Sequence, residues 1–215
     1  MNQETEDYIR DHSSSEDPLL NELFRYTHLN VVNPNMLSGH LQGKFLEFIT
    51  GMLKPLYALE IGTYTGYSAI SIARALPEKG VLHTIDPNDE LSGICRSYFD
   101  RAGLSGKIVA HTGRAQVIIP ALKLKFDLIY IDGDKREYTE YYQLALQYLT
   151  PAGIILADNV LWGGKATTPD SPDPQTRGII EFNQMVKDDT TVEKLILPFR
   201  DGMTMIRKKI SSKSS

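Results

Sequence analysis

The sequence predicts an α/β fold: a doubly wound, seven-stranded sheet that is mostly parallel, has an antiparallel C-terminal strand and carries helices on both faces. Five short apolar runs alternate with amphipathic stretches, which is typical of parallel strands buried on both sides. The last two β-prone runs, 192–199 and 202–208, are joined only by Arg200 and Asp201. No helical crossover fits between them, so we expect them to pair antiparallel.

Each strand-like run is followed by a helix-like one. Residues 18–28 and 39–53 have helical patterns and are expected to cover one end of the sheet. The predicted strands are 57–62, 81–86, 107–112, 126–132 and 153–158, and the helices after the first four are 67–76, 92–102, 115–122 and 138–149. Residues 162–176, rich in Pro, Gly, Thr and Asp, are predicted to be a loop, and a long loop beside a strand end often serves as a substrate lid.

The length of 215 residues suits a single domain, expected over residues 1–210, with a flexible segment at 1–17 and a disordered tail at 211–215. The N-terminus is polar and acidic, unlike a signal peptide, and no apolar run is long enough to span a bilayer. We therefore expect a cytoplasmic protein with no membrane partner. The single cysteine, Cys95, excludes internal disulfides, and the net charge of −4 argues against a strongly basic nucleic-acid binder.

Residues at the ends of the first two strands predict a nucleoside site, because ligands of open α/β sheets bind outside the carboxyl ends of the strands. The turn from Glu60 to Gly66 has glycines that let the backbone bend tightly at Gly62 and let the next helix start close to the strand at Gly66. Its spacing is not the dinucleotide fingerprint, and Glu60 disfavours a pyrophosphate. Asp86 can accept both ribose hydroxyls, so the cationic S-adenosylmethionine fits. Alternatively, this is an ordinary βαβ glycine turn.

The fourth and fifth strands end in oxygen ligands. Asp132 follows the fourth strand, Asp158 and Asn159 end the fifth, and adjacent strand tips lie about 5 Å apart. An oxygen-only set favours Mg²⁺ or another divalent cation that keeps open positions. Lys135 lies three residues beyond Asp132, where desolvation beside a cation favours the neutral amine that can act as a base. Alternatively, Asp-Gly and Asp-Asn are common turn sequences and Lys135 is solvated.

Taken together, these motifs resemble the cation-dependent O-methyltransferase family, which contains catechol O-methyltransferase and caffeoyl-CoA O-methyltransferase. The resemblance spans about residues 36–208 and is carried by segments 36–43 (MLSGHLQG), 59–68 (LEIGTYTGYS), 85–86 (ID), 131–135 (IDGDK) and 157–162 (ADNVLW). It implies a Rossmann-like methyltransferase domain and a homodimer. Asp134 stands where catechol O-methyltransferase has a bulky aromatic residue, and this acidic residue places the chain with the plant-type and bacterial members.

The resemblance also implies roles for individual positions. The cofactor set would be Met36, Ser38, Glu60, Gly62, Thr63, Tyr64, Ser68, Asp86, Ala115 and Asp132. Within it, Asp86 would bind the ribose, Ala115 the adenine and Ser68 the methionine carboxylate. The cation would be bound by Asp132, Asp158 and Asn159, and Lys135 would be the catalytic residue.

The activity predicted from these residues is methyl transfer from S-adenosylmethionine to one of two vicinal oxygens of a catechol-like small molecule. The same chelate could form on 5-hydroxyuridine of a tRNA, the substrate of some bacterial relatives. A basic rim for RNA would come from Lys44, Lys54, Arg136, Lys165 and Arg177. A nicotinamide-dependent oxidoreductase is less consistent because the dinucleotide fingerprint is missing, and a non-catalytic nucleoside-binding module leaves the cation ligands and the lysine unexplained.

Overall fold

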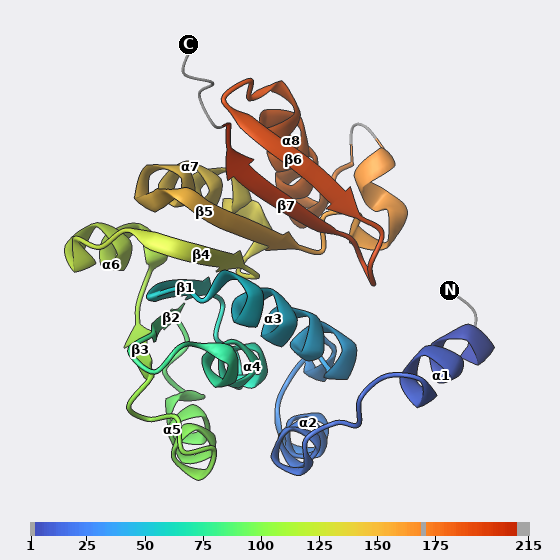
Figure 1. Cartoon of the computed structure of the whole chain (residues 1–215). Coiled ribbons are helices and arrows are strands. Elements are labelled where there is room, and N and C mark those ends of the chain that lie inside the picture. The colour runs from blue at the N-terminus through green and yellow to red at the C-terminus, as the bar shows by residue number, and fades with distance from the viewer. Residues whose placement is uncertain (1–2, 169–170, 210–215) are drawn as a thin grey trace.

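A computed structural model describes residues 3–168 and 171–209. One seven-stranded sheet forms the middle layer, with helices on both faces (Figure 1). The strands are β1 (Tyr57–Ile61), β2 (Val81–Asp86), β3 (Ile108–Thr112), β4 (Phe126–Ile131), β5 (Leu149–Asp158), β6 (Val192–Leu197) and β7 (Met203–Lys208). The α-helices are α1 (Gln3–Asp11), α2 (Pro18–Asn30), α3 (His40–Leu53), α4 (Tyr67–Ala75), α5 (Ser92–Arg101), α6 (Ala115–Leu122), α7 (Tyr138–Tyr148) and α8 (Pro174–Asp188), and the short 3-10 helices are η1 (Pro34–Met36), η2 (Lys135–Glu137) and η3 (Trp162–Thr167).

The strand order is β3-β2-β1-β4-β5-β7-β6. The first five strands are parallel, and β7 runs antiparallel between β5 and β6, which confirms the predicted sheet and C-terminal hairpin. The chain builds outward from β1 to β3 and then returns to place β4 on the other side of β1. This reversal opens a crevice at the carboxyl ends of β1 and β4, where open α/β sheets bind ligands.

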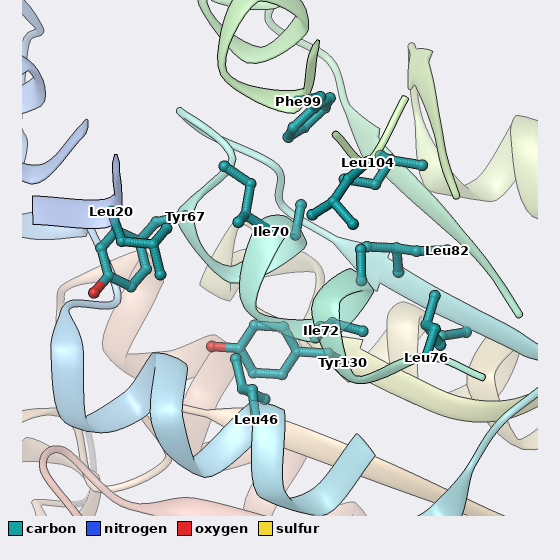
Figure 2. Packing of buried hydrophobic residues seen from close by; sticks show 14 of the residues in the cluster. Leu20, Leu46, Tyr67, Ile70, Ile72, Leu76, Leu82, Phe99, Leu104 and Tyr130 are labelled. Carbon is teal, nitrogen blue, oxygen red and sulfur yellow. The ribbon is translucent and has the colours of Figure 1, made fainter. Parts of the chain in front are cut away.

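Two apolar cores lie on the two faces of the sheet. One joins α2, α3, α4 and α5 to the strands, and Figure 2 shows its packing around Ile70, Leu46 and Tyr130. The other joins α6, α7 and α8 to the opposite face. The expectation that 18–28 and 39–53 cover one end of the sheet was therefore wrong, because Leu23 and Leu46 bury α2 and α3 on the face that α4 also covers.

The segment 162–176 is not a loop throughout. Its first part is η3, and α8 begins inside it at Pro174. The side chain of Asp173 accepts hydrogen bonds from the backbone N–H of Thr176 at 3.1 Å and from its hydroxyl at 2.6 Å. A capping aspartate followed by proline at the first helical position is a strong helix start, so the sequence carried the signal for α8.

The N-terminal segment 1–17, predicted to be flexible, contains α1 and contacts the rest of the fold. The Glu16 carboxylate accepts a hydrogen bond from the hydroxyl of Tyr67 at 2.5 Å, and Asp17 caps α2 by accepting from the backbone N–H of Leu19 at 2.9 Å. The predicted tail 211–215 lies outside the described residues. Within the part of the chain that the structure describes, no helix is both long and apolar enough to cross a membrane.

Candidate active site

A pocket of about 910 Å³ lies at the carboxyl ends of the central strands. Its lining includes the predicted site residues Met36, Ser38, Gly62, Thr63, Tyr64, Ser68, Asp86, Ala115, Asp132, Lys135, Asp158 and Asn159. Glu60 is the predicted residue that does not line it, because its side chain is fully buried beneath the turn after β1. The volume suits a cofactor together with a small acceptor.

The glycine turn after β1 brings the chain close to β4. Gly62 has a φ of +105°, and a Cβ there would collide with the backbone carbonyl of Asp132. Gly66 caps α4 at a φ of +90°, and a Cβ there would lie 2.7 Å from the ring of Phe99. Gly62 is thus required by the close approach of the Asp132 backbone, which the sequence had not predicted, whereas the tight bend predicted there agrees with its positive φ. Gly66 makes room for Phe99 of α5, not for β1 as we had expected.

Glu60 is a buried carboxyl group with unfilled hydrogen-bonding capacity. It is 0% exposed, its Oε2 accepts a hydrogen bond from the hydroxyl of Thr84 at 2.5 Å, and its Oε1 has no partner among the described residues. Burial raises the pKa of Glu60 to about 8 and the charges of Asp132 and Asp86 add to that rise, whereas the nearby hydroxyls of Ser68 and Thr84 oppose it. A cationic ligand group at Oε1 would satisfy the orphaned oxygen and favour its ionised form.

Asp86 fixes the adjoining turn at the end of β2. Its Oδ2 accepts from the backbone N–H of Tyr64 at 2.8 Å and its Oδ1 from that of Asn88 at 2.9 Å, so both oxygens are oriented. The Tyr64 hydroxyl donates to the carbonyl of Val32 at 3.1 Å. That contact ties the connection between α2 and α3, which carries Met36, to the glycine turn.

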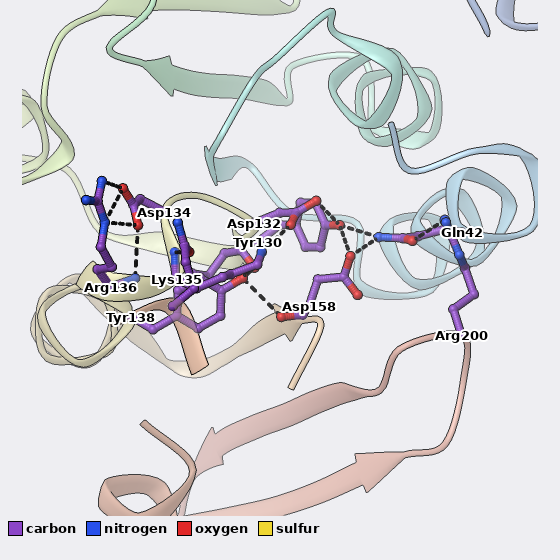
Figure 3. Close-up of polar contacts among 11 residues, drawn as sticks. Gln42, Tyr130, Asp132, Asp134, Lys135, Arg136, Tyr138, Asp158 and Arg200 are labelled. Carbon is purple, nitrogen blue, oxygen red and sulfur yellow. Dashed lines mark hydrogen bonds and ion pairs between the residues drawn. The ribbon is translucent and has the colours of Figure 1, made fainter. Parts of the chain in front are cut away.

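Two carboxylates converge at the ends of β4 and β5 (Figure 3). The hydroxyl of Tyr130, which is buried in the sheet, lies 3.2 Å from Asp132 Oδ2 and 3.3 Å from Asp158 Oδ2. Asp158 is 3% exposed, and burial together with the nearby charge of Asp132 raises its pKa. Asn159 follows in the left-handed conformation with a φ of +58° and lines the same pocket.

Lys135 is held against this pair by residues on three elements. It is 7% exposed, and its Nζ donates to Asp132 Oδ1 at 2.8 Å and to the hydroxyl of Tyr138 at 2.7 Å. Tyr138 in turn donates to the carbonyl of Asp158 at 3.0 Å. Helix α8 supports the lysine backbone, because a Cβ at Gly178 would collide with the carbonyl of Lys135. The solvated alternative for Lys135 is therefore wrong.

The candidate cation ligands are oxygen atoms only. Over residues 3–168 and 171–209, no group of three or more His, Cys, Asp or Glu side chains is placed to hold a metal ion. The candidate set is smaller, with two carboxylates, Asp132 and Asp158, and the amide of Asn159. In the described part of the chain, the one buried ammonium that faces them, that of Lys135, is outnumbered by the half-buried carboxylate of Asp132 and the buried carboxylate of Asp158, and the excess of negative charge suits a hard divalent cation.

Several polar residues of the site were not predicted. Gln42, Tyr130, Tyr138 and Arg200 all bond to the carboxylates, the lysine or one another. Gln42 was part of the motif at 36–43, and its place in that motif was the usable signal. Arg200 was assigned only to a hairpin turn, and no local pattern places a turn residue against a distant helix.

The basic residues suggested as an RNA rim do not line this pocket. Lys44 pairs with Glu47, and Arg136 pairs with Asp134. Lys54 ends α3 just before β1 begins, which places it at the opposite edge of the sheet from the pocket.

Comparisons with known proteins agree with the fold. A family model described as O-methyltransferase matches residues 10–209. The chain belongs to the O-methyltransferase family. It is 39% identical over 183 residues to a catechol O-methyltransferase of Niastella koreensis, covering 81% of this chain and 80% of that one, and 30% identical over 207 residues to a probable caffeoyl-CoA O-methyltransferase of Dictyostelium discoideum, covering 94% and 90%.

Solved structures of O-methyltransferases have the same architecture. TomG of Streptomyces achromogenes, solved in complex with SAM, superposes with a TM-score of 0.90 at 29% identity and covers 98% of this chain and 100% of its own. An O-methyltransferase of Bacillus cereus in complex with SAH superposes with a TM-score of 0.89 at 29% identity, covering 96% and 97%. The likeness therefore extends over essentially the whole O-methyltransferase fold.

Proposed function

We propose that this O-methyltransferase transfers the methyl group of S-adenosylmethionine to one hydroxyl of a catechol-like small molecule, with a divalent cation such as Mg²⁺ bound beside the acceptor. The observation that carries the proposal is the single pocket that joins two chemically distinct ends. One end is lined by Asp86, with Glu60 buried beneath the adjoining turn, and the other is lined by Asp132, Lys135 and Asp158. The catechol O-methyltransferase of Niastella koreensis and the SAM complex of TomG support the same assignment.

The Glu60 end fits the methyl donor. An orphaned, buried carboxylate oxygen suits the ammonium group of a methionine moiety, and the oriented Asp86 carboxylate suits a ribose diol. Ser68 and Thr63 line the pocket between them, and Ala115 lines it at the end of β3. Among the described residues that line this end, Arg114 is the cationic one, and a single cation is too few to neutralise a pyrophosphate, which favours a sulfonium nucleoside over a dinucleotide.

The Asp132 end fits a divalent cation. Asp132, Asp158 and Asn159 would hold it, since their oxygens are the ligands that Mg²⁺ prefers. When bound, the cation would supply the Lewis-acid charge that stabilises an acceptor oxyanion. Two adjacent acceptor oxygens could chelate the cation together, whereas a single oxygen could not. This is why a vicinal dioxygen is the proposed acceptor.

Lys135 is the proposed general base. Its neutral amine would take the proton of the acceptor hydroxyl, and the oxyanion would then attack the methyl carbon as the methyl–sulfur bond breaks. Tyr138 directs the amine through the 2.7 Å contact with Nζ. The oxyanion and the sulfonium react to give neutral products, and a site shielded from water favours such a loss of charge. The side chain of Lys135 is only 7% exposed, so its surroundings provide this shielding.

Matched phenolic acids test the acceptor assignment. Caffeate carries two adjacent hydroxyls, whereas p-coumarate has the same skeleton with one. With Mg²⁺ and labelled S-adenosylmethionine, we expect label in caffeate and none above background in p-coumarate. Equal labelling of both acids would contradict the requirement for a vicinal dioxygen.

The RNA acceptor stays an untested prediction, and the same assay extends to it. Total cellular RNA takes the place of the phenol, and label in wobble nucleosides after digestion would assign the acceptor to tRNA. We expect no such label, because three of the five suggested rim residues are poorly placed for RNA: Lys44 and Arg136 pair with acidic side chains, and Lys54 lies at the opposite edge of the sheet.

A further inference from the structure

Gln42 connects α3 to the carboxylates at the ends of β4 and β5 (Figure 3). The side chain is 2% exposed, and its Nε2 donates to Asp158 Oδ2 and to the Tyr130 hydroxyl, both at 2.5 Å. Tyr130 in turn bonds to both Asp132 and Asp158. One amide group thus touches Asp158 directly and Asp132 through a phenol.

Arg200 determines which way that amide points. Its Nη1 donates to Gln42 Oε1 at 2.6 Å. A guanidinium has donors only, so the side of the amide that faces Arg200 must be its oxygen, and the NH₂ group must face Asp158 and Tyr130. Without the arginine, the amide could turn over and present its oxygen to a carboxylate, which is repulsive.

The backbone at Arg200 adopts a strained conformation. Its φ is +52°, in the left-handed region that favours glycine, at the tip of the β6–β7 hairpin. Strain of this kind persists where the surroundings enforce it, and it is frequently found at functional sites. Here the contact that accompanies the strain is the hydrogen bond to Gln42.

A neutral donor differs from a cation in its effect on Asp158. Lys135 donates to Asp132 as an ion pair and cancels its charge, whereas the amide of Gln42 orients Asp158 and leaves its negative charge in place. The Gln42 and Tyr130 contacts both fall on Oδ2 of Asp158. Neither of these hydrogen bonds involves Oδ1 of Asp158.

We propose that Gln42 and Arg200 are positioning residues, in which Arg200 fixes the amide of Gln42 and Gln42 fixes Asp158 and Tyr130 for cation binding. The inference rests on the cation of the proposed function. It adds two residues, from α3 and from the β6–β7 turn, that bind no reacting group and determine how the carboxylates are presented.

The test measures Mn²⁺ binding directly, by electron paramagnetic resonance of the free ion, in the full-length protein without acceptor. For Gln42→Met we expect affinity to fall about 10- to 100-fold, the range found when partners of metal ligands are removed. Arg200→Met should also weaken binding, and Arg200→Lys, which keeps one donor, should restore part of it. Arg207→Met, which removes an exposed pair with Glu193 on the same hairpin, is the matched control and should bind as wild type.

The sign of the Arg200→Met effect separates positioning from simple electrostatics. Removing a positive charge near two carboxylates should strengthen cation binding if charge alone matters, whereas loss of positioning weakens it. Because Arg200 should act through Gln42, the double variant should bind no more weakly than Gln42→Met alone. Stronger binding in Arg200→Met, or additive losses in the double variant, would overturn the relay.

Arg200→Gly separates positioning from stability. Glycine relieves the positive φ, so the variant should unfold at a denaturant concentration no lower than wild type while it still binds Mn²⁺ more weakly. Affinity for S-adenosylmethionine should stay within about twofold in all variants, since Asp86 is untouched. Wild-type Mn²⁺ affinity in Gln42→Met would overturn this inference alone, whereas no Mn²⁺ binding by wild type would overturn it together with the cation of the proposed function.

Discussion

Glu60 shows how one buried residue can set the pH response of ligand binding. Its carboxyl group lies under the glycine turn with Oε1 unpartnered, and burial raises its pKa to about 8. At neutral pH the ligand-free protein therefore holds it mostly as the neutral acid. A cationic methyl donor favours the carboxylate, so binding should be coupled to release of a proton.

The affinity for S-adenosylmethionine should consequently rise as pH increases from 6 towards 8, because less free energy is needed to ionise Glu60. Titration calorimetry at several pH values measures the slope. The isosteric Glu60→Gln variant should bind more weakly and lose this pH dependence. An unchanged slope in that variant would show that another group releases the proton.

For Lys135 we expect a different contribution, to the rate of methyl transfer and not to donor binding. Its amine donates to Asp132 and to Tyr138, and neither of these hydrogen bonds involves Asp86. Lys135→Met should lower kcat by roughly 10²- to 10⁴-fold, the usual contribution of a general base, and leave the dissociation constant of S-adenosylmethionine within a few-fold. Rapid-quench assays and calorimetry measure the two quantities. A parallel loss of both would assign Lys135 a structural role.

At the scale of single elements, the turn from β1 to α4 is tightly constrained. Gly62→Ala would place a methyl group against the carbonyl of Asp132 at a φ of +105°. We expect a loss of about 2 kcal/mol or more in the free energy of unfolding, measured with urea. The control is Gly93→Ala in α5, where a Cβ meets no atom within 4 Å, and it should stabilise by about 0.5–1 kcal/mol. Equal effects would mean that the close approach of β1 and β4 is not required.

Elements with a strong local pattern could be predicted from the sequence, and those that depend on distant contacts could not. The strands β1 to β5 show buried apolar runs, and the spacing of β6 and β7 leaves room only for a hairpin. Helix α8 was not predicted, because the Pro, Gly, Thr and Asp content of residues 162–176 is typical of a loop. The same residues include Asp173 and Pro174, which cap and begin the helix. The pocket residues at strand ends follow from sheet topology, whereas Gln42 and Arg200, separated by 158 positions, meet only in the folded chain.

At the scale of the whole molecule, the reversal of strand order at β1 and β4 is what joins the two ends of the pocket. Glu60 and Asp86 come from β1 and β2 on one side of the reversal, and Asp132 and Asp158 come from β4 and β5 on the other. The methyl donor and the acceptor would therefore meet above a rigid, doubly covered sheet. Such a scaffold favours in-line transfer because reacting groups need little further ordering.

The family resemblance predicts a homodimer, and molecular mass tests it. Light scattering coupled to size-exclusion chromatography should give a mass twice that of the 24.1 kDa chain. Large apolar side chains that stand exposed in the single chain, among them Phe48 and Met52 on α3 and Leu195 on β6, agree with a covered surface. A mass of one chain at micromolar concentration would contradict the homodimer.

The central claim is that the donor end and the cation end of one pocket act in the same reaction. The most direct test is methyl transfer from labelled S-adenosylmethionine to caffeate, with Mg²⁺ and with EDTA, in wild type and in Asp158→Ala. We predict transfer with Mg²⁺ that EDTA abolishes, and no transfer by the variant although it still binds the donor. Undiminished transfer in EDTA or by Asp158→Ala would contradict the account.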